Sequence, residues 1–223
     1  KKKLGENTIY IEQKKIKEIV GSQDQIAVAN GGFNLIKFKK DGKIIINPIN
    51  ISSKNLEKFE NKFMLFHTGI FRVAQDIAKT FVTNFDAKSE YLHKIDSLVD
   101  DALKYLKNNN YDDFGNLLNQ TWELKKKIGS KISNKKIDDI YNKAIKYGAL
   151  GGKLLGAGGG GLIIFYVPSD KQQKLKKALS DLLYIPFKFD FEGSKIIYKS
   201  IEKKYPLEEK IRSLNKFKVF KKT

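Results

Sequence analysis

The sequence of 223 residues contains no cysteine, one methionine and two histidines. Without cysteine, the chain can form neither disulfide bonds nor thiolate metal sites. It also has no His-Glu-x-x-His run, the pattern that zinc hydrolases use. No apolar run approaches the roughly 20 residues that a membrane-spanning helix requires, and the start of the chain has no signal-peptide pattern. We therefore expect a cytoplasmic protein with no membrane partner.

Arginine is almost absent, although the chain is strongly basic. Only Arg72 and Arg212 are arginines among 43 basic residues, and the formal net charge is +18. The lysines are scattered along the whole chain, whereas nucleic-acid binders usually cluster arginine and lysine with aromatic residues on one face. We interpret the charge as a solvated surface that attracts small anions, with no specific nucleic-acid partner. A hydrophobic content of 41% is enough for a core.

Glycine is concentrated in one stretch. Residues 148–161 hold eight of the 17 glycines, and the apolar run Leu162–Val167 follows directly. Flexible linkers are flanked by polar residues, so this stretch is typical of a constrained loop before a buried strand. Successive exposed N–H groups in such a loop suit an anion. A tight turn between helix and strand is the alternative, but four consecutive glycines exceed what a turn needs.

The spacing of apolar residues predicts the order of helices and strands. Helices are expected over residues 7–20, 22–30, 53–60, 71–82, 88–109, 111–128, 133–148, 169–183 and 207–214. Strands are expected over residues 33–38, 44–51, 62–67, 162–167, 185–189 and 194–199. The two kinds of element alternate without the regular spacing of a doubly wound sheet, which indicates an α+β fold. From residue 62 onward, the order suits a ferredoxin-like antiparallel sheet with helices on one side.

Polar residues mark the ends of several of these elements. Ser22 and Gln25 have the spacing of a capping box at the start of a helix. Ser53 and residues 133–134 are expected to cap the helices that follow them. Lys40–Lys43 contains an Asp-Gly pair between two strands, which predicts a β-hairpin.

Four residues are candidates for a functional site on their sequence context alone. Asp24 lies in the first turn of a helix, where the dipole keeps a carboxylate charged, although such aspartates are common without a catalytic role. Thr68 and Gly69 precede a predicted helix, whose N-terminus offers contacts to an anion or a hydroxyl. Arg72 presents a planar fork that binds phosphate or carboxylate through two bonds; a structural salt bridge is an equal alternative.

Together with the glycine loop, three other stretches occur in the order found in a known family. They are Val20–Gln25 with Gly31–Asn34, then His67–Ala74, then Trp122–Lys127. In this order the chain resembles the GHMP small-molecule kinases from about residue 4 to residue 198. The resemblance implies a remnant of an N-terminal nucleotide-binding domain over residues 1–51. It further implies a ferredoxin-like C-terminal domain over residues 52–199, followed by a basic tail over residues 200–223 to which we assign no role.

The resemblance also implies a function and its cofactors. It is strongest to the branch that uses ATP and Mg²⁺ to phosphorylate the anomeric hydroxyl of a heptose 7-phosphate. A fucokinase-like or other sugar kinase of the family remains an alternative, as does a truncated module that binds a sugar phosphate or another anion without turnover. The expected partners are ATP and a sugar phosphate, and the oligomeric state stays open.

Site residues follow from the same resemblance. Asp24 falls on the catalytic aspartate that faces the hydroxyl to be phosphorylated, and Glu12 falls on a glutamate that helps to hold Mg²⁺. The substrate contacts implied are Thr68, Gly69, Arg72 and Lys126, with Lys125 as an alternative to Lys126. The phosphate loop implied consists of Gly156, Ala157, Gly158, Gly159 and Gly160.

The start of the sequence suggests a larger protein. It begins with three lysines instead of methionine, and no stretch matches the family's Gly/Ser-rich loop that cradles the ATP phosphates. We expect that loop to lie upstream. If so, residues 1–51 should expose apolar helix faces and strand edges.

Overall fold

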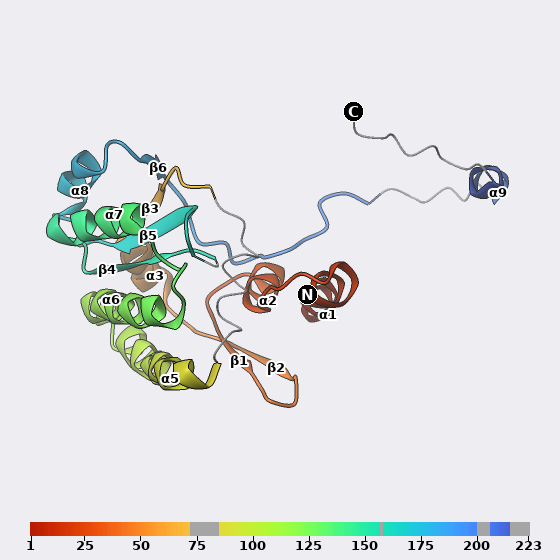
Figure 1. The fold of residues 1–223 in the computed structure, drawn as a ribbon, viewed down its shortest axis with the longest axis horizontal. Coiled ribbons are helices and arrows are strands. Elements are labelled where there is room, and N and C mark those ends of the chain that lie inside the picture. The colour runs from red at the N-terminus through yellow and green to blue at the C-terminus, as the bar shows by residue number, and fades with distance from the viewer. Residues whose placement is uncertain (72–84, 157, 200–205, 215–223) are drawn as a thin grey trace.

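The structure is a computed structural model, and it describes residues 1–71, 85–156, 158–199 and 206–214 (Figure 1). Its first elements are α1 (Lys2–Tyr10), the π-helical turn η1 (Ile11–Ile16) and α2 (Gln23–Asn30). Helix α1 crosses α2 closely at Gly5, where a Cβ atom would lie 2.8 Å from Ile26 Cδ1. The helix predicted over residues 7–20 is wrong at both ends. It begins earlier and stops before Lys17, whose φ of 62° is left-handed.

A β-hairpin follows α2, as predicted. Strands β1 (Asn34–Phe38) and β2 (Ile44–Pro48) pair antiparallel in a two-stranded sheet. Gly42 supplies the turn with a φ of 80°, and Asp41 Oδ1 accepts a hydrogen bond from the Lys43 N–H over 3.1 Å. The carboxylate and the glycine therefore form the turn that the Asp-Gly pair predicts.

The second part of the chain builds a four-stranded sheet with helices. Its elements are α3 (Ser53–Glu60), β3 (Phe63–His67), α5 (Phe85–Lys107), α6 (Tyr111–Ile128), α7 (Lys135–Lys146), β4 (Gly151–Leu154), β5 (Leu162–Tyr166), α8 (Gln172–Ala178) and β6 (Leu183–Ile185). The sheet is antiparallel, in the order β4-β5-β3-β6. Numbered along the chain, these strands lie in the order 2-3-1-4, which is the ferredoxin-like arrangement. The predicted fold class is confirmed.

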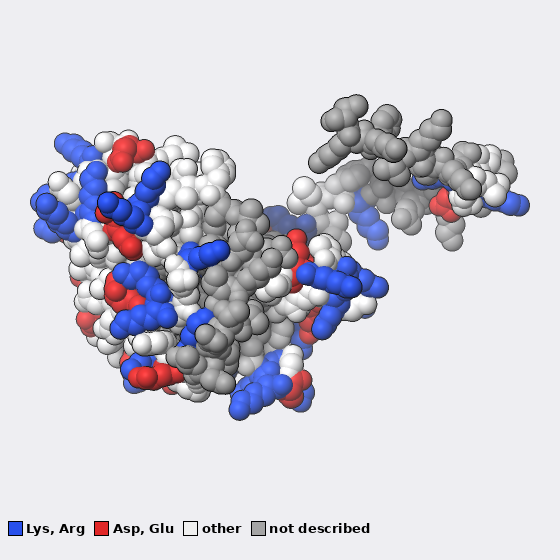
Figure 2. All heavy atoms as spheres, viewed as in Figure 1, with Lys and Arg blue, Asp and Glu red and all other residues white. Residues whose placement is uncertain are grey.

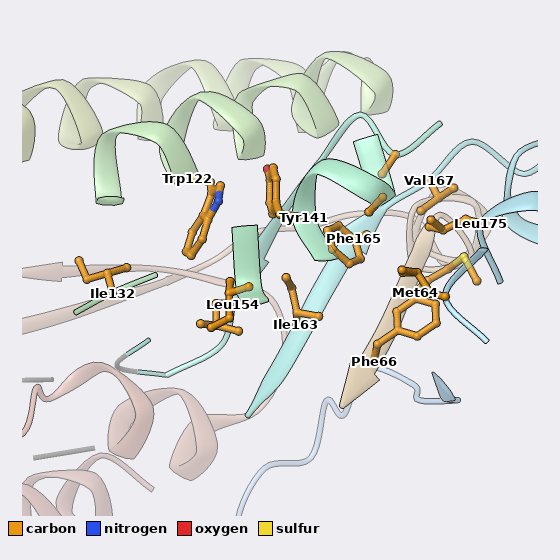
Figure 3. Close-up of a cluster of buried hydrophobic side chains, with 14 of the residues drawn as sticks. Met64, Phe66, Trp122, Ile132, Tyr141, Leu154, Ile163, Phe165, Val167 and Leu175 are labelled. Atoms are coloured by element: carbon orange, nitrogen blue, oxygen red, sulfur yellow. The ribbon is translucent and has the colours of Figure 1, made fainter. Parts of the chain in front are cut away.

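Two clusters of buried side chains cover opposite faces of this sheet. The larger cluster lies between the sheet and helices α6, α7 and α8 (Figure 3), and its members include Met64, Phe66, Trp122, Tyr141, Ile163, Phe165 and Leu175. The smaller cluster joins Phe59 of α3 to Phe63, Tyr111 and Tyr166. Phe63 and Tyr166 are paired across β3 and β5, so both point away from the larger cluster.

Strand β4 lies inside the stretch that was predicted to be a loop throughout. A Cβ atom on Gly151 would lie 2.2 Å from the carbonyl oxygen of Gly115 in α6, and one on Gly152 would lie 2.5 Å from Phe165 Cδ1. Only glycine allows α6 to approach the edge strand this closely. Gly151 therefore serves the packing of α6 on the sheet, Gly152 leaves room for Phe165 of β5, and the loop itself is limited to residues 155–161.

Beyond β6 the chain returns to α2, which the sequence did not predict. The Ser194 N–H donates to Val28 O over 3.1 Å, and the Gly32 N–H donates to Asp190 O over 2.8 Å. Among the described residues, no strand forms over 194–199, and β6 ends at residue 185, so both predicted strands are wrong. Helix α8 is also shorter than the helix predicted over 169–183. Helix α9 (Pro206–Leu214) lies where a tail helix was expected.

The surface is charged and, near the N-terminus, partly apolar. Figure 2 shows basic and acidic side chains interspersed on the visible face, as expected for a solvated lysine-rich surface. The exposed apolar side chains of residues 1–51 are Leu4, Tyr10, Ile11, Ile16, Ile19, Val28, Phe38 and Ile45. None of the helices in the described ranges is long and apolar enough to cross a bilayer.

Candidate functional site

Asp24 lies in the first turn of α2 and is exposed to solvent. Ser22 precedes the helix, but its side chain accepts no hydrogen bond from the helix N–H groups, so the predicted capping box is wrong. Its hydroxyl instead accepts a bond from Gln13 Nε2 over 3.1 Å. The start of α2 thus combines an open carboxylate with N–H groups that carry no side-chain cap. This arrangement suits contact with a polar ligand.

Glu12 is half-buried in η1 and is joined to the start of α2. One of its carboxylate oxygens, Oε2, accepts a hydrogen bond from Nε2 of Gln25, the residue after Asp24. The neighbouring Gln13 also donates to Val20 O over 3.0 Å. The π-helical turn therefore directs two consecutive side chains to the same segment, which brings Glu12 and Asp24 into one corner of the molecule.

This corner offers oxygen atoms of the kind that Mg²⁺ prefers. Gln25 Oε1 is buried and has no hydrogen-bond partner among the described residues. Those residues hold no group of three or more His, Cys, Asp or Glu side chains that could form a complete metal site. Magnesium usually takes one or two carboxylates and completes its shell with phosphate and water oxygens. Glu12, with an unpaired amide oxygen beside it, fits such a partial site.

The glycine loop has a backbone that other residues rarely adopt. Gly156, Gly158, Gly159 and Gly161 have φ values of 72°, 110°, 75° and 87°. Gly160 has no such angle, but a Cβ atom there would lie 2.5 Å from Ile70 O. Four of these glycines are thus required by conformation and one by lack of space.

Two glycine N–H groups in the described part of the loop are bonded inside the protein. The Gly159 N–H donates to Ile132 O over 2.8 Å, and the Gly161 N–H donates to Ile70 O over 3.0 Å. Within the described part of the chain, the N–H groups of Gly158 and Gly160 have no acceptor, although both residues are buried. Buried N–H groups are nearly always paired, so these two groups suit an acceptor brought by a ligand.

Thr68 and Gly69 lie at the end of β3, against the loop. Thr68 is buried, and both its N–H and its hydroxyl donate to Gly161 O, over 2.9 and 2.8 Å. The Gly69 N–H donates to His67 Nδ1 over 3.2 Å. These residues were predicted to contact the substrate. In the structure, the Thr68 hydroxyl binds the loop itself.

The two candidate lysines of α6 differ in their partners. Lys126 forms an ion pair with Glu123 over 2.8 Å. Lys125 donates to Gly156 O over 3.3 Å and so reaches the glycine loop. Lys125 is therefore the lysine that contacts the loop, although the sequence favoured Lys126. Arg72 and Ala157, also predicted as site residues, lie outside the described residues.

Asn134 is a site neighbour that the sequence analysis treated only as a helix cap. Its Oδ1 accepts from the Ile137 N–H over 3.1 Å, which confirms the cap, and its Nδ2 donates to Gly159 O over 3.1 Å. Asn134 and Gly159 are 25 residues apart, so no local pattern could have indicated their contact. The hydrogen bonds thus form two groups, one around Glu12 and α2 and one around the loop.

One cavity of the described residues lies elsewhere. It has a volume of about 520 Å³. Its lining residues are Leu35, Asn47, Pro48, Ile49, Asn50, Ile51, Ser52, Asn55, Leu103, Leu106, Lys107 and Asn109. None of the predicted site residues is among them, so this cavity is separate from the candidate site.

Family comparison explains this combination of fold and loop. The family described as GHMP kinases C terminal matches residues 102–185, which extend from α5 to β6 and include the whole glycine loop. This part of the chain is therefore similar to the C-terminal domain of GHMP kinases. GHMP kinases are therefore the proteins with which strands β4 to β6 and the glycine loop are compared.

Similar sequences include two sugar kinases. A protein of Campylobacter jejuni named D-glycero-alpha-D-manno-heptose 7-phosphate kinase is 36% identical over 191 residues, covering 83% of this chain and 56% of that protein. A bifunctional fucokinase/GDP-fucose pyrophosphorylase of Arabidopsis thaliana is 25% identical over 171 residues, covering 72% of this chain and 16% of that protein. The chain thus spans about half the length of the first relative and much less of the second.

A similar solved structure agrees with the sequence comparison. The crystal structure named as a D-glycero-D-manno-heptose 1-phosphate kinase from Bacteroides thetaiotaomicron has a TM-score of 0.65 at 26% identity. The match covers 87% of this chain and 55% of that chain. The arrangement of elements is therefore shared with a heptose phosphate kinase over most of the present sequence.

Proposed function

We propose that this chain is part of a sugar kinase that transfers the γ-phosphoryl group of ATP to the anomeric hydroxyl of a heptose 7-phosphate. The observation that carries the proposal is the glycine loop, in which two buried N–H groups have no acceptor among the described residues while the neighbouring N–H groups are bonded to the protein. The similarity to two proteins named as heptose phosphate kinases supports the choice of substrate. Their names place the phosphate differently, at position 7 or 1, so the substrate must be tested directly.

In the proposed reaction, Asp24 faces the acceptor hydroxyl. The carboxylate is exposed and lies in the first turn of α2. It accepts the proton as the sugar oxygen attacks the γ-phosphorus and ADP leaves. Phosphoryl transfer has a loose transition state, so catalysis depends mainly on positioning and charge stabilisation. Asp24 therefore holds the sugar hydroxyl in position for its attack on the phosphorus.

The loop and Glu12 hold the other reactants in this proposal. The N–H groups of Gly158 and Gly160 contact phosphate oxygens of the nucleotide. Glu12 contributes one carboxylate to Mg²⁺, which when bound neutralises charge on the phosphates. Gln25 fixes the orientation of Glu12 through their hydrogen bond. Thr68, Gly69, Arg72 and Lys126 remain the proposed contacts for the sugar phosphate.

The first test is an assay of ADP release with ATP, Mg²⁺ and a panel of acceptors: heptose 7-phosphate, heptose 1-phosphate and fucose. We expect turnover with heptose 7-phosphate and a product carrying a second phosphate by ³¹P NMR. If none of the acceptors is phosphorylated in an ATP-dependent reaction, the proposed kinase activity is refuted. Preference for fucose would replace heptose phosphate by the fucokinase alternative.

The second test replaces the proposed base. Asp24→Asn should lower kcat by at least ~100-fold, the scale of a lost acid–base or orienting group. Because Asp24 is exposed, the free energy of unfolding should not change measurably. Asp41→Asn, at the exposed hairpin turn, is the matched control and should keep full activity. Wild-type turnover in Asp24→Asn would exclude the assigned role.

A further inference from the structure

Two segments clamp alternate residues of the glycine loop. On one side, Gly159 donates to Ile132 O over 2.8 Å and accepts from Asn134 Nδ2 over 3.1 Å. On the other side, Gly161 donates to Ile70 O over 3.0 Å and accepts from the backbone and side chain of Thr68. Gly160 lies between the two clamped residues, and its N–H has no acceptor among the described residues.

The direction of the Gly160 N–H follows from one of these bonds. The carbonyl of Gly159 and the N–H of Gly160 belong to the same peptide unit. No cis peptide bond occurs in the described chain, and in a trans peptide the C=O and the N–H point in opposite directions. The Asn134 side chain binds the C=O, so the N–H is turned away from the α6–α7 connection. Asn134 thereby fixes the orientation of the peptide unit that carries the Gly160 N–H, a donor without an acceptor among the described residues.

Glycine alone would not hold this orientation. A peptide unit flanked by glycines can rotate by half a turn at low steric cost, because glycine populates both signs of φ. After such a rotation, the Gly160 N–H would face Asn134, and an external anion would lose this donor. A hydrogen bond to the Gly159 carbonyl opposes this rotation, because the rotation would break it. In this structure Asn134 Nδ2 donates that bond.

Asn134 is suited to this task by having both a donor and an acceptor. Its Oδ1 caps α7 through the Ile137 N–H, which fixes the side-chain rotamer and leaves Nδ2 directed at the loop. Aspartate would cap α7 equally well but has no hydrogen to donate. An Asn134→Asp exchange therefore separates the cap from the clamp.

We propose that Asn134 is a positioning residue that turns the Gly160 N–H toward a phosphate group bound at the glycine loop. The nature of the ligand rests on the proposed kinase function, whereas the control of peptide orientation does not. In Asn134→Asp, the carboxylate repels Gly159 O and attracts the Gly160 N–H. The peptide unit then rotates, and the donor is withdrawn from the anion site.

The test uses three variants of the 223-residue chain labelled with ¹⁵N-glycine. They are Asn134→Asp, which keeps the cap and loses the clamp, Asn134→Ala, which loses both, and Ser133→Ala. The last removes the adjacent Ser133–Asp138 hydrogen bond, which does not touch the loop. Unfolding by urea measures the cap, the Gly160 amide resonance measures the peptide orientation, and calorimetric titration with inorganic tripolyphosphate measures the anion site.

We expect Asn134→Asp to unfold at the wild-type urea concentration and to show a downfield shift of the Gly160 amide proton. Its affinity for tripolyphosphate should fall by about tenfold or more, because a hydrogen bond to a charged group is lost. Asn134→Ala should lose stability and affinity together, and Ser133→Ala should keep the wild-type affinity. A purely structural role predicts wild-type affinity in Asn134→Asp.

Three outcomes would overturn the proposal. They are an unchanged Gly160 resonance in Asn134→Asp, unchanged tripolyphosphate affinity in that variant, and no binding of tripolyphosphate by the wild type. Failure of the kinase function is a separate result. It would be seen as absent sugar phosphorylation while the wild type still binds tripolyphosphate and Asn134→Asp still weakens that binding, and Asn134 would then position the loop for another anion.

Discussion

Replacing Gly115 by alanine sets helix propensity against packing. Gly115 lies in the interior of α6, where alanine normally stabilises a helix by about 1 kcal/mol. In this structure, however, a Cβ atom at position 115 would lie 2.4 Å from Tyr166 Cδ1 and 2.9 Å from its Cγ. Real Cβ atoms essentially never come so close, so either the ring or the helix must move.

The Tyr166 ring has little freedom to move. Its hydroxyl donates to Asp112 Oδ1 over 2.9 Å, which ties the ring to the same helix. The ring forms a T-shaped pair with Phe63, with ring centroids 5.4 Å apart. It also contacts the ring of Phe59, at a centroid distance of 6.4 Å. Overpacking of this kind costs about 1–3 kcal/mol, and the fixed ring places the cost near the upper end. After subtraction of the helix gain, we expect a net loss of about 2 kcal/mol.

Urea unfolding measured by circular dichroism tests this value. Gly115→Ala should lower the midpoint without changing the slope, since the surface exposed on unfolding is the same. Gly21→Ala is the control, because a Cβ atom there meets nothing within 4 Å. It should be neutral or slightly stabilising through the unfolded state. A midpoint for Gly115→Ala at or above that of the wild type would show that the α6–β5 contact is not close-packed as described.

Two further substitutions test buried polar groups. Tyr141→Phe removes the acceptor of the Gly152 N–H and the donor to Asn119 Oδ1, so urea unfolding should show a loss of about 1–3 kcal/mol; an unchanged midpoint would contradict these bonds. For Glu60, burial opposes ionisation, but bonds from Lys188 and the Phe189 N–H outweigh it and lower its pKa. Its stabilising effect is therefore present above the ordinary glutamate pKa and lost as pH falls through the lowered value. The melting temperature of Glu60→Gln should lie below that of the wild type at pH ~7 and converge with it near pH ~3; a gap that does not depend on pH would refute the argument.

Local sequence patterns were sufficient for elements that are stabilised within themselves. Helix α6 occupies the predicted range, Tyr111–Ile128, because its apolar spacing has a helical period over five turns. The hairpin was predicted from Asp41 and Gly42, which form their turn without help from distant residues. The cap of α7 by Asn134 is likewise a contact between near neighbours.

Patterns failed where a distant part of the chain decides the outcome. Residues 194–199 have the composition of a strand, but a strand needs a partner, and among the described residues none pairs with them. Gln25 was read as part of a capping box, yet its side chain binds Glu12 in η1 instead. Gly151 and Gly152 were read as loop glycines, although they form an edge strand under α6.

By itself, the sequence determined the fold class, the order of most elements and the position of a glycine loop after a helix. These depend on periodicity and on backbone preference, which are local properties of the chain. Only the tertiary structure decided how the loop carbonyls of Gly161 and Gly159 are bonded, because the bonds come from Thr68 and Asn134, 93 and 25 residues away in the sequence. A run of glycines can adopt many backbone conformations, and contacts with the surrounding residues select one of these conformations.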